Sequence, residues 1–189
     1  MNEKKIALLI ISDDYSDTQF KSLKAPQTDG EQLASVLRDK TIGQYDVQLI
    51  VNNPHYKILE RIEGALKNCG RDDLDILYFS GHGIKDDRGK LFFATTNTNT
   101  DLLMATAISA TTINDLMARC RSKRKVLLLD TCYSGAFVEG MTHKAGEQMD
   151  VRSFFDEGTG HVVMTASDAL QYAFEEDGLS GESKGSIFT

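Results

Sequence analysis

The chain has few cysteines and no excess of positive charge. Its three cysteines, Cys69, Cys120 and Cys132, form no C-x-x-C pair, which argues against a zinc knuckle or a disulfide framework. Because the number is odd, at least one thiol must be free. The net charge of −7 argues against a broad surface for nucleic acid or for an anionic membrane. We therefore expect a protein or a small molecule as the partner, and neither nucleic acid nor membrane.

Long apolar segments are also lacking. The longest runs, around residues 6–11 and 126–129, are far shorter than the roughly 20 residues that cross a bilayer. No apolar signal-peptide core follows the first five residues, so we predict a cytoplasmic protein.

What is present is an alternation of short runs rich in Val, Ile and Leu with amphipathic stretches. Continuous apolar strands between helices are typical of a parallel sheet that is covered on both faces, so the predicted class is α/β. We expect one domain over residues 1–189, with a long mobile loop at about 138–160. The predicted strands span residues 5–12, 46–51, 75–80, 125–130 and 161–165, and the predicted helices span 28–38, 58–68 and 112–121.

Reactive side chains follow two of these strands. Ligands of open parallel sheets bind beyond the carboxyl ends of the strands. There, His82 lies between two glycines, and Cys132 follows Asp130 and Thr131. An imidazole beside a thiol favours the nucleophilic thiolate, so the two residues suit a Cys-His pair. The alternative is that Cys132 is a small buried hydrophobe and His82 a turn residue.

The segments that hold these two residues carry a family resemblance. Residues 78–83 (YFSGHG) and 130–135 (DTCYSG) resemble the two signature motifs of caspase-like cysteine peptidases, closest to metacaspases and bacterial caspase homologues. Residues 23–30 and 185–189 extend the resemblance over nearly the whole chain, although Pro26 replaces a cysteine of the family stretch. The resemblance implies a caspase-like α/β/α sandwich with a mostly parallel sheet. Relatives continue with a further helix and often a strand, so we expect the chain to be a truncated or processed part of a longer protein.

The same resemblance implies peptide-bond hydrolysis. His82 would be the general base and Cys132 the nucleophile, and the backbone amides of Gly83 and Cys132 would form the oxyanion hole. No metal or organic cofactor takes part in these steps. Calcium dependence stays open, because Asp86, Asp87 and residues 95–101 are only a poor copy of the acidic cluster that binds calcium in some metacaspases.

Three positions match the residues with which metacaspases hold a basic side chain before the cut. They are Asp29, Ser80 and Asp130, and Asp168 is a further candidate at the rim. Leu23 stands where caspases that cut after aspartate carry an arginine. Carboxylates in a partly desolvated pocket favour a cation, so we expect cleavage after Arg or Lys. The alternative for Asp29 is that it merely stabilises a helix N-terminus.

The resemblance also implies regulation. The loop after the nucleophile contains Lys144 and Arg152, at which an enzyme of this specificity could cut itself. Such domains act in stress, cell death or phage defence and are commonly joined to sensor or effector domains.

Three other functions compete with this one. A phospho-receiver domain would explain Asp13 and Asp14, but Ser80 stands where its phosphate-accepting Asp should be. A catalytically silent caspase-like interaction module would share the fold, and another Cys-His acyl transferase would leave Asp29 and Asp130 unexplained.

Two remaining features are expected to be structural. Cys69 and Cys120, at predicted helix ends, are assigned to packing. The basic residues at 119, 121 and 123–125 are interpreted as a solvated helix end rather than a nucleic-acid patch.

Overall fold

A mostly parallel sheet of seven strands forms the centre of the molecule. The computed structural model describes residues 3–133 and 161–165. The predicted α/β class with a mostly parallel sheet is therefore confirmed. The strands are β1 (Lys5–Ile11), β2 (Asp46–Val51), β3 (Leu74–Lys85), β4 (Leu91–Phe93), β5 (Ile108–Ser109), β6 (Arg124–Tyr133) and β7 (His161–Thr165).

The central strand is β3, which pairs in parallel with β1 on one edge and with β6 on the other. Strand β2 extends the sheet beyond β1, and β7 extends it beyond β6. Gly83 pairs with Tyr133 of β6 on one side and with Phe93 of β4 on the other. Beside the last part of β3, β4 therefore takes the position that β1 has beside the first part. Strand β5 then pairs antiparallel with β4.

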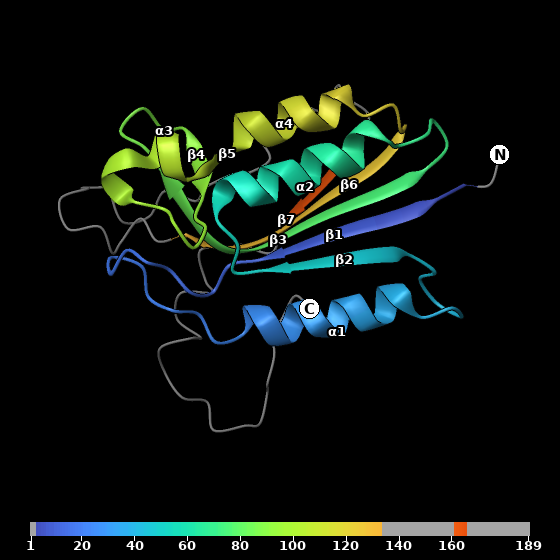
Figure 1. Ribbon diagram of the computed structural model, residues 1–189, viewed down its shortest axis with the longest axis horizontal. Helices are drawn as coiled ribbons and strands as arrows, with labels where there is room; N and C mark the ends of the chain where they lie inside the picture. The colour runs from blue at the N-terminus through green and yellow to red at the C-terminus, as the bar shows by residue number, and fades with distance from the viewer. Residues whose placement is uncertain (1–2, 134–160, 166–189) are drawn as a thin grey trace.

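Helices cover both faces of the sheet. Helix α1 (Pro26–Arg38) covers one face, and α2 (His55–Lys67) and α4 (Ala110–Arg119) cover the other (Figure 1). A short 3-10 turn (Thr100–Leu102) and α3 (Leu103–Thr106) lie beside β4 and β5. Pro26 starts α1 with a preset φ, and the Ser109 side chain caps α4 by accepting a hydrogen bond from the Thr112 amide. Each helix within the described residues is too short or too polar to cross a bilayer.

The two faces of the sheet bury separate cores because strand side chains alternate. Leu77 and Phe79 pack with residues of α2 and α4 in the larger core, whereas Tyr78 packs with α1 in the smaller one. A third cluster joins Phe20, in the loop after β1, to Ile84 and to Phe92 of β4. This third cluster covers the carboxyl edge of the sheet, where the reactive motifs lie.

The structure departs from the predicted elements mainly around the two motifs. Strand β3 was expected to end at Ser80, but it continues to Lys85, and β6 continues past Asp130 to Tyr133. The extensions form because β3 and β6 pair with each other over this stretch and β4 pairs with the end of β3. Strands β4 and β5 and helix α3 were not predicted, since segments of two to four residues are too short to show a periodicity. The predicted loop at 138–160 lies outside the described residues.

The interpretation of Cys69 and Cys120 as simple packing residues is wrong. A disulfide joins them across 51 residues of sequence. Cys69 follows the C-terminal end of α2, and Cys120 is the residue that ends α4. The two helices pack side by side on one face of the sheet, which brings their ends together (Figure 1).

Four residues of the basic run, at 119, 121, 123 and 124, are exposed as predicted, but Lys125 is not. The side chain of Lys125 is buried, and its ammonium donates hydrogen bonds to the carbonyl oxygens of Met117 (2.8 Å) and Cys120 (3.4 Å) at the end of α4. The expected attraction between a cation and a helix C-terminus is therefore present, but inside the protein. Arg124 forms an exposed ion pair with Glu3 at 3.0 Å.

Candidate active site

The register of β3 and β6 places the two motifs side by side. The Cα atom of His82 is paired with that of Cys132, and the Cα atom of Ser80 with that of Asp130. Neighbouring parallel strands lie about 4.8 Å apart, so this pairing brings the backbones of the proposed base and nucleophile together. Gly83 follows His82 on the same strand and is paired with Tyr133.

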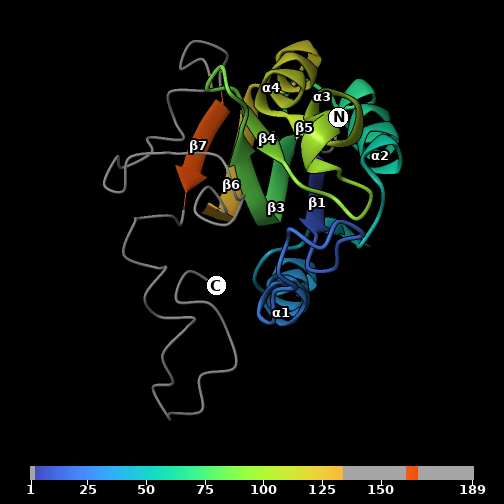
Figure 2. The same cartoon turned by 90° about the vertical axis from the view of Figure 1, so that its left-hand side faces the viewer.

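The His82 ring is held between aromatic side chains from the loop that follows β1. It stacks on Phe20, with the ring centroids 5.6 Å apart, and contacts Tyr15 at 5.1 Å. Only 6% of His82 is exposed. The loop after β1 therefore shields the imidazole from bulk water and fixes the plane of its ring (Figure 2 views this end of the sheet).

One hydrogen bond determines which ring nitrogen carries the proton. The Nε2 atom of His82 lies 2.8 Å from the carbonyl oxygen of Lys21. A carbonyl oxygen only accepts, so Nε2 must be the donor, and the lone pair of the neutral ring is on Nδ1. The backbone of the loop after β1 thus selects the tautomer in which Nδ1 is the basic atom.

The backbone next to His82 is anchored by Tyr15. The His82 amide donates to the Tyr15 hydroxyl at 3.1 Å, and this hydroxyl donates in turn to the carbonyl oxygen of Ser12. Gly81 has a φ of 155°, and a Cβ atom at this position would lie 2.8 Å from the Ser12 carbonyl oxygen. Glycine is therefore required where β3 passes the end of β1.

Three of the residues predicted to hold a basic side chain, Asp29, Ser80 and Asp130, lie near the buried hydroxyl of Tyr78. This hydroxyl donates to Oδ2 of Asp130 at 3.3 Å and is also hydrogen-bonded to Ser80. Burial raises the pKa of Tyr78 well above its usual range, and the negative charges of Asp130 and Asp29 add to the rise. The negative charges of Asp29 on α1 and Asp130 on β6 therefore both act on the Tyr78 hydroxyl.

Helix α1 brings Asp29 to the sheet by packing closely on β1. A Cβ atom on Gly30 would lie 2.5 Å from Cδ1 of Ile11, so the absence of a side chain lets the two elements approach. Asp29 is 1% exposed in the first turn of α1. This position is compatible both with a pocket carboxylate and with the alternative role of stabilising the helix N-terminus.

The segments considered for calcium have local structural roles. Asp86 accepts hydrogen bonds from the amides of Arg88 and Lys90 in the turn before β4. The hydroxyl of Thr98 bonds to the Thr95 amide and to the Thr106 carbonyl oxygen. Among the described residues, the potential ligands found within 4.8 Å of one another belong to Cys69, Asp75 and Cys120, and neither calcium segment contributes to that group.

Three of the predicted site residues, Lys144, Arg152 and Asp168, lie outside the described residues. Conversely, the structure adds Tyr15, Phe20 and Tyr78, together with the Lys21 carbonyl group, to the neighbourhood of the predicted site. Tyr78 could have been found from the sequence, because it is two residues before Ser80 and shares its face of the strand. A backbone carbonyl such as that of Lys21 leaves no signal in a sequence.

Comparison with known proteins agrees with this architecture. A search of solved structures finds a Geobacter sulfurreducens protein, GSU0716, with a TM-score of 0.56 and 18% sequence identity. The similarity covers 68% of this chain and 50% of that protein, so the match spans about half of its length, and at this identity it supports the fold alone. A search of curated proteins finds no match. The model of the caspase-domain peptidase family, however, matches residues 4–189. The chain therefore belongs to the caspase-domain family of cysteine peptidases.

Proposed function

We propose that the protein is a cysteine endopeptidase that uses His82 and Cys132 and cleaves after Arg or Lys. The observation that carries the proposal is the alignment of His82 with Cys132 on adjacent strands, together with the hydrogen bond that keeps the proton on Nε2 of His82. Membership of a cysteine-peptidase family supports the reaction class.

The proposed reaction proceeds by acyl transfer. Cys132 transfers its thiol proton to Nδ1 of His82, and the thiolate attacks the scissile carbonyl carbon. The backbone amides of Gly83 and Cys132 stabilise the negative oxygen of the tetrahedral intermediate. The imidazolium then protonates the leaving amine, and water hydrolyses the thioester. The Lys21 carbonyl stabilises the imidazolium through the Nε2 proton, and it acts as the orienting group for His82.

The preference for a basic side chain is proposed from the acidic group around Tyr78. Asp130 is half-buried and hydrogen-bonded to Tyr78, and Asp29 is buried on the facing helix. A cation placed there would offset part of the negative charge of two carboxylates in a desolvated setting, whereas an acidic side chain would add a third negative charge. Asp168 is proposed at the rim of the same pocket.

The proposal includes a processing step and a cellular role. Self-cleavage after Lys144 or Arg152 would release an active form, with proteins as the natural substrates and a signal or a fused sensor domain as the trigger. The proposed setting is the cytoplasm, in stress, cell death or phage defence. Neither calcium nor another cofactor is assigned a step.

The decisive experiment compares fluorogenic peptides that end in Arg, Lys or Asp, with and without calcium. Cys132→Ala should abolish turnover, a loss of at least about 10³-fold, because no other group supplies the nucleophile. The matched control is the double variant Cys69→Ala/Cys120→Ala, which removes the disulfide at the opposite edge of the sheet and should retain turnover. Intact mass and peptide mapping of the same samples follow cleavage at Lys144 and Arg152.

The outcomes separate the parts of the proposal. Turnover after Asp alone would contradict the acidic pocket but not the dyad. Turnover that persists in Cys132→Ala would contradict the dyad. A folded protein with no turnover on any peptide, and no cut in the loop, would instead favour a silent interaction module.

A further inference from the structure

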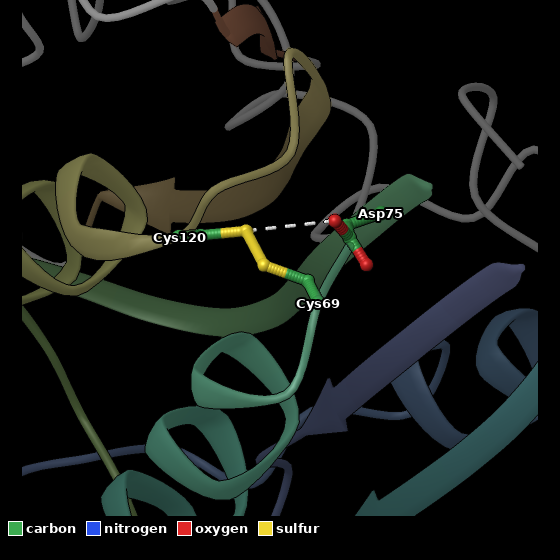
Figure 3. Close-up of side chains that lie close together, drawn as sticks. All are labelled: Cys69, Asp75 and Cys120. Atoms are coloured by element: carbon green, nitrogen blue, oxygen red, sulfur yellow. Dashed lines mark hydrogen bonds between the residues drawn. A yellow bond between two sulfur atoms is a disulfide. The ribbon is translucent and has the colours of Figure 1, made fainter. Parts of the chain in front are cut away.

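A second group of chemically reactive side chains lies at the amino edge of the sheet, opposite the candidate active site. Figure 3 shows Cys69, Asp75 and Cys120 converging from the end of α2, from β3 and from the end of α4. All three are buried, with exposed fractions of 4%, 6% and 5%. Asp75 precedes His82 by seven residues on β3, which is roughly 23 Å of strand at about 3.3 Å per residue. The two sites are therefore physically separate.

The surroundings of the two sulfur atoms suit both redox states. The Cα atoms of Cys69 and Cys120 are 6.3 Å apart, within the range of about 4.4–6.8 Å that a disulfide requires. Each sulfur also faces an acceptor for a thiol proton. Cys69 Sγ lies 2.9 Å from the Leu66 carbonyl oxygen, and Cys120 Sγ lies 3.6 Å from Oδ2 of Asp75. Two thiols could thus form hydrogen bonds in the same backbone arrangement in which the disulfide is made.

Charged groups beside Cys120 can accept its thiol proton and stabilise the thiolate. Burial raises the pKa of the Asp75 carboxyl, so Asp75 is a stronger base than an exposed carboxylate, although the Ser122 hydroxyl and the charge of Lys125 oppose part of this rise. Lys125 is paired with Asp75 in the strand register and donates to the Cys120 carbonyl oxygen. Its positive charge favours a thiolate nearby.

The same ammonium argues against a metal site. Two thiolates and a carboxylate are ligands that zinc accepts. A dication at this position would, however, be buried beside the positive charge of Lys125, and the two sulfur atoms are bonded to each other. The observations therefore favour redox chemistry over metal binding.

We propose that Cys69 and Cys120 form a reversible dithiol–disulfide pair that is oxidised by hydrogen peroxide, with Asp75 as the proton acceptor for Cys120. Hydrogen peroxide is a small oxidant, which suits sulfur atoms of residues that are only 4% and 5% exposed. The Cys120 thiol gives its proton to Asp75, and the thiolate attacks one peroxide oxygen. The O–O bond breaks, and the departing hydroxide takes the proton from Asp75 to form water.

The second step closes the disulfide. The Cys69 sulfur attacks the sulfenic acid on Cys120, the S–O bond breaks, and the departing hydroxide takes the Cys69 thiol proton to form a second water. In total, two thiols and one peroxide yield one disulfide and two waters, with two electrons passing from sulfur to oxygen. A dithiol reductant reverses the change by thiol–disulfide exchange. The bond covalently joins the ends of α2 and α4 and leaves Cys132 as the cysteine outside the pair.

The test uses the full chain with Cys132→Ala, in which every remaining thiol belongs to the pair, so its result does not depend on peptidase activity. A few equivalents of peroxide should remove both alkylation sites and yield a peptide in which Cys69 is linked to Cys120, and a dithiol should restore both sites. The oxidised protein should melt roughly 5–10 °C above the reduced one, because the crosslink closes a long loop of the unfolded chain. With Cys69→Ser added, peroxide should give no such rise.

The role of Asp75 is tested by measuring both the rate of disulfide formation and the final amount of disulfide. Asp75→Asn should slow disulfide formation about ten-fold while leaving the final crosslink and its melting shift unchanged, a split that a purely structural role would not produce. An unchanged rate would overturn that role. Two cysteines that remain alkylatable after peroxide, or a disulfide that a dithiol cannot open in the folded protein, would overturn the proposed pair. If the reduced protein binds one equivalent of zinc and its two cysteines then resist oxidation by peroxide, the group is instead a metal site.

Discussion

At the amino edge of the sheet, hydrogen bonds to the Asp73 carboxylate and the disulfide between Cys69 and Cys120 hold short turns in place. At the carboxyl edge, a longer loop packs over His82. Asp73 accepts from the amides of Lys4 and Gly70 at 3.0 and 2.6 Å, and its own carbonyl oxygen accepts from Ser122 at 2.7 Å. At the other edge, His82 is held by aromatic rings and by the carbonyl oxygen of Lys21.

This difference separates the groups that stabilise the fold from the groups that would carry out peptide hydrolysis. The hydrogen bonds of Asp73 at the amino edge hold β1, β3 and β6 together, so their loss should reduce stability. Groups at the carboxyl edge fix a tautomer, a ring plane and the position of two carboxylates, so their loss should reduce activity. Substitutions at matched positions of the two edges can break or sharpen this contrast.

The largest expected effect is at His82. His82→Ala should lower kcat by at least about 10³-fold, because the general base and its proton route are both lost. The free energy of unfolding, measured by urea titration, should change far less than the activity. A variant that keeps more than a tenth of the wild-type kcat while folding normally would contradict the assignment of His82 as the base.

The next largest effect is expected at Asp130. Asp130→Asn should lower kcat/KM for peptides ending in Arg or Lys by about 10²-fold, since a buried cation would lose its counter-charge. Peptides with a neutral residue before the cut serve as the control and should lose much less. An equal loss on both kinds of peptide would show that Asp130 supports the structure rather than the selectivity.

A smaller effect, on stability alone, is expected at the amino edge. Asp73→Asn should reduce the free energy of unfolding by about 1–2 kcal/mol at pH 7, because the backbone donors of Lys4 and Gly70 face a weaker acceptor. Turnover per folded molecule should stay unchanged. A loss of activity without a loss of stability would reverse the contrast between the two edges.

The pH dependence of this variant gives a further check. Hydrogen bonds from the amides of Gly70 and Lys4 lower the pKa of Asp73 below its ordinary value of 3.8. A carboxyl whose folded-state pKa is lowered stabilises the protein above its unfolded pKa and loses that contribution as the pH falls through the folded value. The stability difference between wild type and Asp73→Asn should therefore be full near pH 7 and shrink below about pH 4.

The smallest effect is expected at Tyr15. Tyr15→Phe keeps the ring beside His82 but removes the hydroxyl that links the His82 amide to the Ser12 carbonyl oxygen. We expect a loss of about 1 kcal/mol in stability and a several-fold lower kcat with little change in KM. Tyr15→Leu, which also removes the ring, should cost more. A Tyr15→Phe variant equal to wild type would show that the hydroxyl contributes nothing, and equal values for the two variants would show that the ring contributes nothing beyond it.

Much of the framework could be predicted from residue patterns. The predicted spans of β2 and β7 coincide with the observed ones, because short apolar runs rich in β-branched residues favour strands. The ends of β3 and β6 could not be predicted in the same way. Glycine and histidine have no strand pattern, and these extensions exist because the two strands and β4 pair with one another.

The candidate site was predictable in its side chains but not in their surroundings. His82, Asp29 and Asp130 were found from residue type and motif. The aromatic rings that enclose His82 come from a loop some sixty residues earlier in the chain, and the Lys21 group that fixes its tautomer is a backbone carbonyl.

The sequence by itself determined the class of the sheet, the two motifs and the family they resemble, because these depend on local composition and short spacings. Only the tertiary structure decided the alignment of His82 with Cys132, the tautomer of His82 and the bond between Cys69 and Cys120. Each of these joins groups that lie about 50 or more residues apart. Their proximity arises from strand register and helix packing, which no local pattern of residues contains.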